Sequence, residues 1–255
     1  MGRLETTLRA VVADGRKAFI PYVTGGFPGV GPELLQALQR LGADAIEVGI
    51  PHSDPVMDGG VIQEASRVAL ERRTRVTDVL TTVADAGLDA PVAAMTYANP
   101  VERRGGDAFV HDLAEAGVSG VIVPDLPVDE AAALGTLASG AGIDLVLLAA
   151  PGTTDDRYAM IADASHGFVY CVATYGVTGA RDALSDTARR VVEALRNRTE
   201  LPLVVGVGIG TPEQAAAACA FADGVIVGSA LMARLVEGDP EGAIDLAGAF
   251  RVAIA

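Results

Sequence analysis

The sequence predicts an α/β fold: a single (β/α)8 TIM barrel over residues 1–255, with an extra N-terminal helix. Eight short apolar segments alternate with segments of helical pattern along the chain. The apolar segments are nearly continuous, which is typical of parallel strands buried on both faces. Eight such units match a closed barrel better than a doubly wound open sheet, which usually has fewer strands. No linker rich in proline or serine divides the chain, so we expect one domain.

The first expected helix runs from about residue 4 to residue 15. Leu4, Leu8 and Val11 or Val12 share one of its faces, and its place before the first strand suits it to close the bottom of the barrel. The eight expected strands are 18–23, 45–50, 91–97, 120–123, 144–148, 167–172, 203–205 and 223–227. The expected helices are 31–41, 62–71, 76–86, 106–116, three that end at 138, 162 and 195, one that begins at 212, and then 229–236 and 240–253. We expect loops at 98–100 and 174–182.

The composition limits the classes of partner and compartment. The net charge of -14 argues against nucleic acid, which needs clustered basic residues. An anionic substrate is still compatible, because backbone N–H groups and helix ends bind phosphate without a basic surface. No apolar run approaches transmembrane length, and the first residues lack the apolar core of a signal peptide. Cys171 and Cys219 lie in apolar segments and are expected to be free thiols, so we expect a cytoplasmic protein.

The second expected strand carries the most informative residues. Glu47 stands between the apolar Ile46 and Val48, where a carboxylate is costly unless it is paired or functional. The loop that follows carries Asp54 and Asp58, at the end of the strand where a barrel places its chemistry. By itself Glu47 is equally compatible with a buried carboxylate satisfied by a neighbour, and Asp58 with a loop-capping residue. Together they form a candidate pair for proton transfer.

Glycine-rich turns follow the last two strands, at Gly206 to Gly210 and at Gly228-Ser229. In barrels these loops bind phosphate through backbone N–H groups, although tight turns alone would also need the glycines. The long loop 175–181 is a candidate lid, with an ordinary surface loop as the alternative. The only lysine, Lys17, precedes the first strand, which excludes a lysine Schiff base inside a strand. The spacing of histidines, cysteines and carboxylates suggests no metal site, and a loop histidine such as His52 is most often incidental.

These pieces, in this order, resemble the tryptophan synthase alpha subunit family over nearly the whole chain. The motifs that carry the resemblance are Pro21-Tyr22-Val23-Thr24 with Gly26 and Pro28-Gly29, the segment from Glu47 through Ser53-Asp54-Pro55 to Asp58-Gly59, Tyr97-Ala98-Asn99-Pro100, Pro124-Asp125-Leu126-Pro127, Gly176-Val177-Thr178-Gly179, Gly206 to Gly210, and Gly228-Ser229. The first two are highly specific. The glycine turns also fit other phosphate-binding barrels.

The resemblance implies retro-aldol cleavage of indole-3-glycerol phosphate to indole and glyceraldehyde 3-phosphate. It implies that Glu47 is the general acid and base, that Asp58 accepts the indole N–H, and that Tyr170 lies beside Glu47. The substrate-binding residues that it implies are Tyr22, Met95, Tyr97, Ile122, Leu148, Thr178 and Val207. The phosphate-binding residues that it implies are Gly179, Gly208, Gly228 and Ser229.

The resemblance also implies an αββα complex with a beta subunit that carries pyridoxal phosphate, whereas this chain would hold no cofactor. The sequence departs from the family pattern in three places, one of which is Ala173-Thr174-Tyr175 at the start of the candidate lid. His52 replaces an aromatic residue, and Gly60 replaces a proline, which gives the loop of Asp58 more freedom. Two alternatives stay open: a stand-alone lyase that releases indole for another pathway, and a non-catalytic barrel that activates a beta-type partner.

Overall fold

The computed structural model describes residues 1–173 and 181–255. Nine strands in these residues form one sheet, and every strand pair in it is parallel. Their bounds are β1 Ala18–Thr24, β2 Ile46–Gly49, β3 Val92–Met95, β4 Gly120–Ile122, β5 Asp144–Val146, β6 Leu148–Ala149, β7 Val169–Val172, β8 Leu203–Gly206 and β9 Gly224–Val227. The strand order is β5-β4-β3-β2-β1-β9-β8-β7-β6, so the two ends of the sheet are neighbours along the chain.

The predicted strand 144–148 is divided at Leu147 into β5 and β6. The first part pairs with β4 and the second with β7. Backbone hydrogen bonds continue across the division, from His166 N to Leu145 O at 2.8 Å and from Tyr170 N to Leu147 O at 3.0 Å. The sheet therefore closes into a barrel, and the predicted (β/α)8 fold is confirmed.

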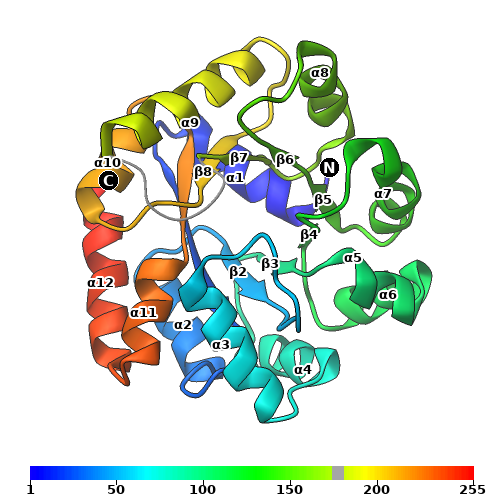
Figure 1. Ribbon diagram of the computed structural model, residues 1–255, viewed down its shortest axis with the longest axis vertical. Helices are drawn as coiled ribbons and strands as arrows, with labels where there is room; N and C mark the ends of the chain where they lie inside the picture. Colours follow the sequence, from blue (N-terminus) through cyan, green and yellow to red (C-terminus); the bar gives the residue numbers. More distant parts are fainter. Residues whose placement is uncertain (174–180) are drawn as a thin grey trace.

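Helices accompany the strands, and all of them except α1 lie around the outside of the barrel, as Figure 1 shows. Their bounds are α1 Arg3–Ala13, α2 Pro32–Arg40, α3 Gly60–Glu71, α4 Val76–Ala86, α5 Ala98–Arg104, α6 Gly106–Glu115, α7 Ala131–Gly140, α8 Asp155–Ala164, α9 Arg181–Arg196, α10 Pro212–Cys219, α11 Ser229–Val236 and α12 Pro240–Ala253, with a 3₁₀ turn at Val128–Glu130. No helix in the described part of the chain combines the length and the apolar character needed to cross a membrane.

Helix α5 contradicts the loop expected at 98–100. Pro100 is its third residue, within the first turn, where a backbone N–H has no partner inside the helix in any case. The N–H of Ala98 is bound instead by Asp125 Oδ1, at 2.9 Å. A side chain from the segment after β4 thus satisfies the start of this helix, which the local sequence does not show.

Helix α1 packs against the end of the barrel where the strands begin. Leu4 and Leu8 are fully buried, and Leu4 lies against Gly120 at the start of β4 and Gly167 just before β7. Asp144, the first residue of β5, accepts hydrogen bonds from Gly2 N at 3.0 Å and Glu5 N at 2.9 Å. A carboxylate at a helix N-terminus binds the unpaired N–H groups there and stabilises the helix. The extra N-terminal helix therefore closes the bottom of the barrel, as the sequence predicts.

Candidate active site

Glu47 lies on β2 with only 1% of its surface exposed. In the strand register it is opposite Tyr22 on β1 and Ala93 on β3. Its Oε2 atom has no hydrogen-bond partner within the described residues. Burial, and then the negative charge of Asp58, raise the pKa of the Glu47 carboxyl group to about 8, because both disfavour the ionised form. At neutral pH Glu47 is consequently protonated and can donate a proton.

Asp58 lies in the loop between β2 and α3 and is partly buried. Tyr97, at the N-cap of α5, donates its hydroxyl hydrogen to Asp58 Oδ2 over 2.9 Å and accepts the N–H of Met57 at 3.1 Å. Burial raises the pKa of Asp58 to about 6, while the bond from Tyr97 and the nearby His52 lower it. Asp58 is thus mainly ionised at neutral pH and can accept a hydrogen bond or stabilise a positive charge.

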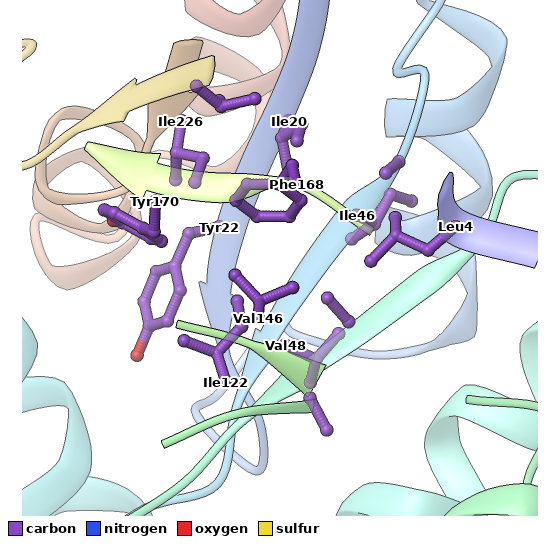
Figure 2. Packing of buried hydrophobic residues seen from close by; sticks show 14 of the residues in the cluster. Leu4, Ile20, Tyr22, Ile46, Val48, Ile122, Val146, Phe168, Tyr170 and Ile226 are labelled. Carbon is purple, nitrogen blue, oxygen red and sulfur yellow. The ribbon is translucent and has the colours of Figure 1, made fainter. Parts of the chain in front are cut away.

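Two tyrosines from different strands lie close to these carboxyl groups. Tyr22 of β1 and Tyr170 of β7 are buried, and Figure 2 shows their rings near each other in the core. Burial, reinforced by the charges of Glu47 and Asp58, raises the pKa of both hydroxyl groups, so they stay protonated. The Tyr22 hydroxyl lies 3.2 Å from Thr24 Oγ1. The two rings and the two carboxyl groups therefore share one region of electrostatic interaction.

Glycines in the strands make room for these rings. A Cβ atom at Gly49 would collide with the hydroxyl end of Tyr22, and one at Gly206 would collide with that of Tyr170. Glycine inside a strand often marks such a close approach. Gly49 was not predicted as a site residue, and Gly206 was predicted only as part of a phosphate-binding turn. The space that they leave for the tyrosine rings depends on the register between strands, which the sequence does not show.

The apolar residues implied by the resemblance come from several strands. Met95 ends β3, Ile122 ends β4 and Leu148 begins β6. Val207 follows β8 with a φ of 65° and is 39% exposed. A β-branched residue rarely adopts this left-handed conformation, and such strain is often found at functional sites.

The glycine turns lie at the same end of the barrel, after β8 and β9. Gly208 has a φ of 94°, Gly228 is the N-cap of α11, and Ser229 is the first residue of that helix. A Cβ atom at Gly59 would lie 3.9 Å from Ser229 Oγ, so the loop that carries Asp58 reaches the start of α11. A helix N-terminus presents unpaired N–H groups to an anion.

Not every N–H group in these turns is available to a ligand. Gln214 Oε1 already accepts the N–H groups of Gly210 at 2.7 Å and Thr211 at 3.2 Å. Thr178 and Gly179, which were predicted to bind the substrate and its phosphate, lie outside the described residues.

His52 was treated as incidental in the sequence, but its ring stacks on Tyr97. The ring centroids are 4.7 Å apart and the ring planes differ by 26°. Sequence reasoning had no signal for this contact, because the two residues lie in different loops and meet only in the folded chain.

One group of potential metal ligands lies within the described residues, at the opposite end of the barrel from the candidate site. It consists of Glu5, Asp144 and His166, whose ligand atoms lie within 4.8 Å of one another. Asp144 already accepts the two N–H groups at the start of α1. Glu5 accepts hydrogen bonds from Arg9 Nε at 2.8 Å and Gly167 N at 3.4 Å. These bonds account for the two carboxylates as structural groups that hold α1.

The chain is similar to known proteins in sequence and in overall structure. Residues 8–248 match the family model described as "Tryptophan synthase alpha chain". The chain is 47% identical to the tryptophan synthase alpha chain of Thermobifida fusca over 242 residues, which cover 92% of this chain and 89% of the relative. It is 45% identical to that of Streptomyces avermitilis over 244 residues, which cover 94% and 88%.

A solved structure of Mycobacterium tuberculosis tryptophan synthase contains a chain that is 40% identical, with a TM-score of 0.90 and coverage of 99% of this chain and 98% of that one. The closed barrel, the paired carboxyl groups and these near full-length matches show that the chain belongs to the tryptophan synthase alpha chain family, whose members act in tryptophan synthesis.

Proposed function

We propose that this chain cleaves indole-3-glycerol phosphate into indole and glyceraldehyde 3-phosphate by a retro-aldol reaction. The observation that carries the proposal is the opposite protonation of two neighbouring carboxyl groups. The pKa of Glu47 is raised to about 8 and that of Asp58 to about 6, so near pH 7 one is an acid and the other an anion. Two carboxyl groups whose environments separate their pKa values are typical of acid–base catalysis.

In the first step, Glu47 donates its proton to C3 of the indole ring, and the ring becomes a cationic indolenine. Asp58 accepts a hydrogen bond from the ring N–H and stabilises the positive charge as it develops. The Glu47 carboxylate then removes the proton of the hydroxyl group next to C3. The bond between C3 and the glycerol carbon breaks, its electrons return to the ring, and indole and the aldehyde form. Glu47 ends the cycle protonated, so the net change is cleavage of the bond between C3 and the glycerol carbon, with one proton transferred from the hydroxyl group to C3.

The other residues would bind the two ends of the substrate. We propose that Tyr22, Tyr97 and Tyr170 line the indole site, together with Met95, Ile122, Leu148 and Val207, because apolar and aromatic walls suit a flat apolar ring. Gly208, Gly228 and Ser229 would bind the phosphate through N–H groups and the Ser229 hydroxyl. Gly179 and Thr178 complete the proposed set, and their roles rest on the sequence alone.

The proposed reaction breaks one carbon–carbon bond by proton transfers, with no electron transfer to or from a second reactant, so it needs no cofactor in this chain. The partner that we propose is a tryptophan synthase beta subunit with pyridoxal phosphate, in an αββα complex that receives the indole. Val56 and Met57, beside Asp58, are 66% and 36% exposed, and an exposed apolar pair is a suitable contact for a partner. We propose the cytoplasm as the compartment and one domain as the organisation. The free thiols of Cys171 and Cys219 fit a reducing environment.

The decisive experiment measures indole release from indole-3-glycerol phosphate by the purified chain, with and without a cognate beta subunit. Weak release that rises strongly with the partner supports the proposed subunit. Strong release that the partner leaves unchanged indicates a stand-alone lyase. No release in either case, by a chain that still activates the beta subunit, overturns the enzymatic proposal in favour of a scaffold.

A further inference from the structure

The stack between His52 and Tyr97 joins two loops at the candidate site. His52 follows β2, whereas Tyr97 follows β3 and is only 3% exposed. Their centroid separation of 4.7 Å with nearly parallel planes is within the range of a stabilising aromatic pair. The imidazole is itself oriented, because its Nδ1 atom accepts the N–H of Asp54 at 3.1 Å. This bond requires Nδ1 to be unprotonated, so the ring hydrogen is on Nε2.

Hydrogen bonds also hold Tyr97 at its hydroxyl group. The hydroxyl group accepts the N–H of Met57 at 3.1 Å and donates to Asp58 Oδ2 at 2.9 Å. The next residue, Ala98, donates its N–H to Asp125. Tyr97 is therefore fixed at its backbone by the segment after β4 and at its hydroxyl by the Asp58 loop.

The loop from His52 to Asp58 thus contacts the Tyr97 side chain twice, once through its first residue and once through its last. His52 packs on the ring face and Asp58 binds the hydroxyl. The loop contains no regular secondary structure between β2 and α3, so few backbone bonds fix its shape. Removal of the ring contact would take away one support of the phenol ring and leave the direction of its hydroxyl group, and with it the bond to Asp58, less constrained.

We propose that His52 is a positioning residue that acts through Tyr97 to hold the carboxylate of Asp58 in place for the reaction. The inference rests on the proposed function in one respect, because the proposed function makes Asp58 the group that must be oriented. His52 itself has no contact with the reacting atoms in this scheme. The charged groups around the pair are Asp54 and Asp58 on the same loop and Asp125 from the segment after β4.

The test is a double-mutant cycle between His52→Ala and Tyr97→Phe, which removes the hydroxyl but keeps the ring. We expect His52→Ala to lower kcat for indole release by about 2- to 10-fold, the size expected for an aromatic pair, with little change in KM. In the Tyr97→Phe background the same substitution should have no further effect. An equal loss in both backgrounds would show that His52 does not act through the hydroxyl bond and would overturn the proposal.

His52→Phe is the matched conservative variant, because it keeps the stacked ring and removes the nitrogen atoms. We expect it to recover most of the activity that His52→Ala loses. If His52→Phe is as impaired as His52→Ala, the ring contact is not the means of positioning and the proposal is wrong.

A second readout is independent of catalysis. Carboxyl ¹³C NMR can follow the titration of Asp58, with its signal assigned by Asp58→Asn. The hydrogen bond from Tyr97 and the nearby His52 both lower the pKa of Asp58, so His52→Ala is compared with His52→Phe, which also removes the imidazole but keeps a stacked ring. If the stack holds the hydrogen bond, the pKa of Asp58 should be higher in His52→Ala than in His52→Phe, and the two variants should not differ in the Tyr97→Phe background. Equal pKa values in His52→Ala and His52→Phe would overturn the inference. If the unmutated chain releases no indole, the proposed function is refuted, but the Asp58 titration can still be interpreted.

Discussion

The negative charge of Asp58 acts on the buried carboxyl group of Glu47 and adds to the effect of burial in raising its pKa. Asp58 keeps its own charge more easily, because Tyr97 donates a hydrogen bond to it and His52 is near. The two groups therefore ionise in sequence, Asp58 first and Glu47 second, as the pH rises. This order underlies the predictions on activity.

Activity should have a bell-shaped dependence on pH. Ionised Asp58 and protonated Glu47 are both required, so kcat/KM should rise as the pH passes about 6 and fall as it passes about 8. The measurement is kcat/KM of indole release from about pH 5 to about pH 9. A rate that stays constant through pH 8 would contradict the assignment of Glu47 as the acid.

Glu47→Gln should lower kcat by about 10²- to 10⁴-fold, because the amide keeps the shape of the side chain but cannot donate and recover a proton. Glu193→Gln, on the exposed face of α9, is the matched control and should leave kcat unchanged. Steady-state kinetics with a parallel thermal melt separates a chemical defect from unfolding. Full activity of folded Glu47→Gln would remove Glu47 from the mechanism.

Asp58→Asn should lower kcat by about 10²-fold, because the neutral amide no longer stabilises the cationic ring. Asp54→Asn on the same loop is the control. The backbone N–H of Asp54 donates to His52, whereas its side chain is exposed, so the substitution should leave that bond in place. Both variants are best measured in the isolated chain, so that contacts with a partner do not enter. Equal losses in the two variants would indicate a general effect on the loop instead.

Stability should fall as the pH rises toward 8. The pKa of Glu47 in the folded chain, about 8, is above the ordinary value of 4.5. Its contribution is therefore fully present below about pH 4.5 and is lost as the pH rises through 8. Each pKa unit corresponds to about 1.4 kcal/mol, so the loss should be about 2–5 kcal/mol. Denaturant unfolding at pH 5 and pH 9 should show this loss in the unmutated chain and a smaller one in Glu47→Gln.

Gly206→Ala should displace Tyr170, because the new methyl group would occupy the place of the hydroxyl end of the ring. We expect a loss of about 1–3 kcal/mol in unfolding free energy, together with weaker substrate binding. Gly140→Ala in α7, whose Cβ would enter open space, is the control and should be neutral or slightly stabilising. Chemical denaturation and KM measure the two effects. Unchanged stability in Gly206→Ala would show that Tyr170 moves aside at no cost.

Most elements of the fold were predictable because their patterns are local. The helices α4 and α12 have the predicted bounds, since an apolar stripe ends at a glycine in one case and begins at a proline in the other. Helix α5 was missed because Ala98-Asn99-Pro100 has the composition of a turn. Its start depends on Asp125, a contact between distant parts of the chain.

In the candidate site, too, features that depend on neighbouring residues were predictable and features that depend on distant contacts were not. Glu47 was identifiable because a carboxylate in an apolar strand is costly wherever that strand is buried. The bond from Tyr97 to Asp58, the stack with His52 and the space that Gly49 and Gly206 leave for the tyrosine rings were not predictable. Each depends on the register between strands or on the meeting of two loops.

The sequence by itself determined the barrel, the position of its acidic strand end and the candidate carboxyl groups, because alternation of apolar segments and isolated charges are properties of neighbouring residues. Only the tertiary structure decided which carboxyl group is protonated at neutral pH. That depends on how completely the folded chain removes water from Glu47 and on which hydroxyl group reaches Asp58. Solvation and hydrogen bonding of a side chain are set by residues that are distant in sequence and become neighbours on folding.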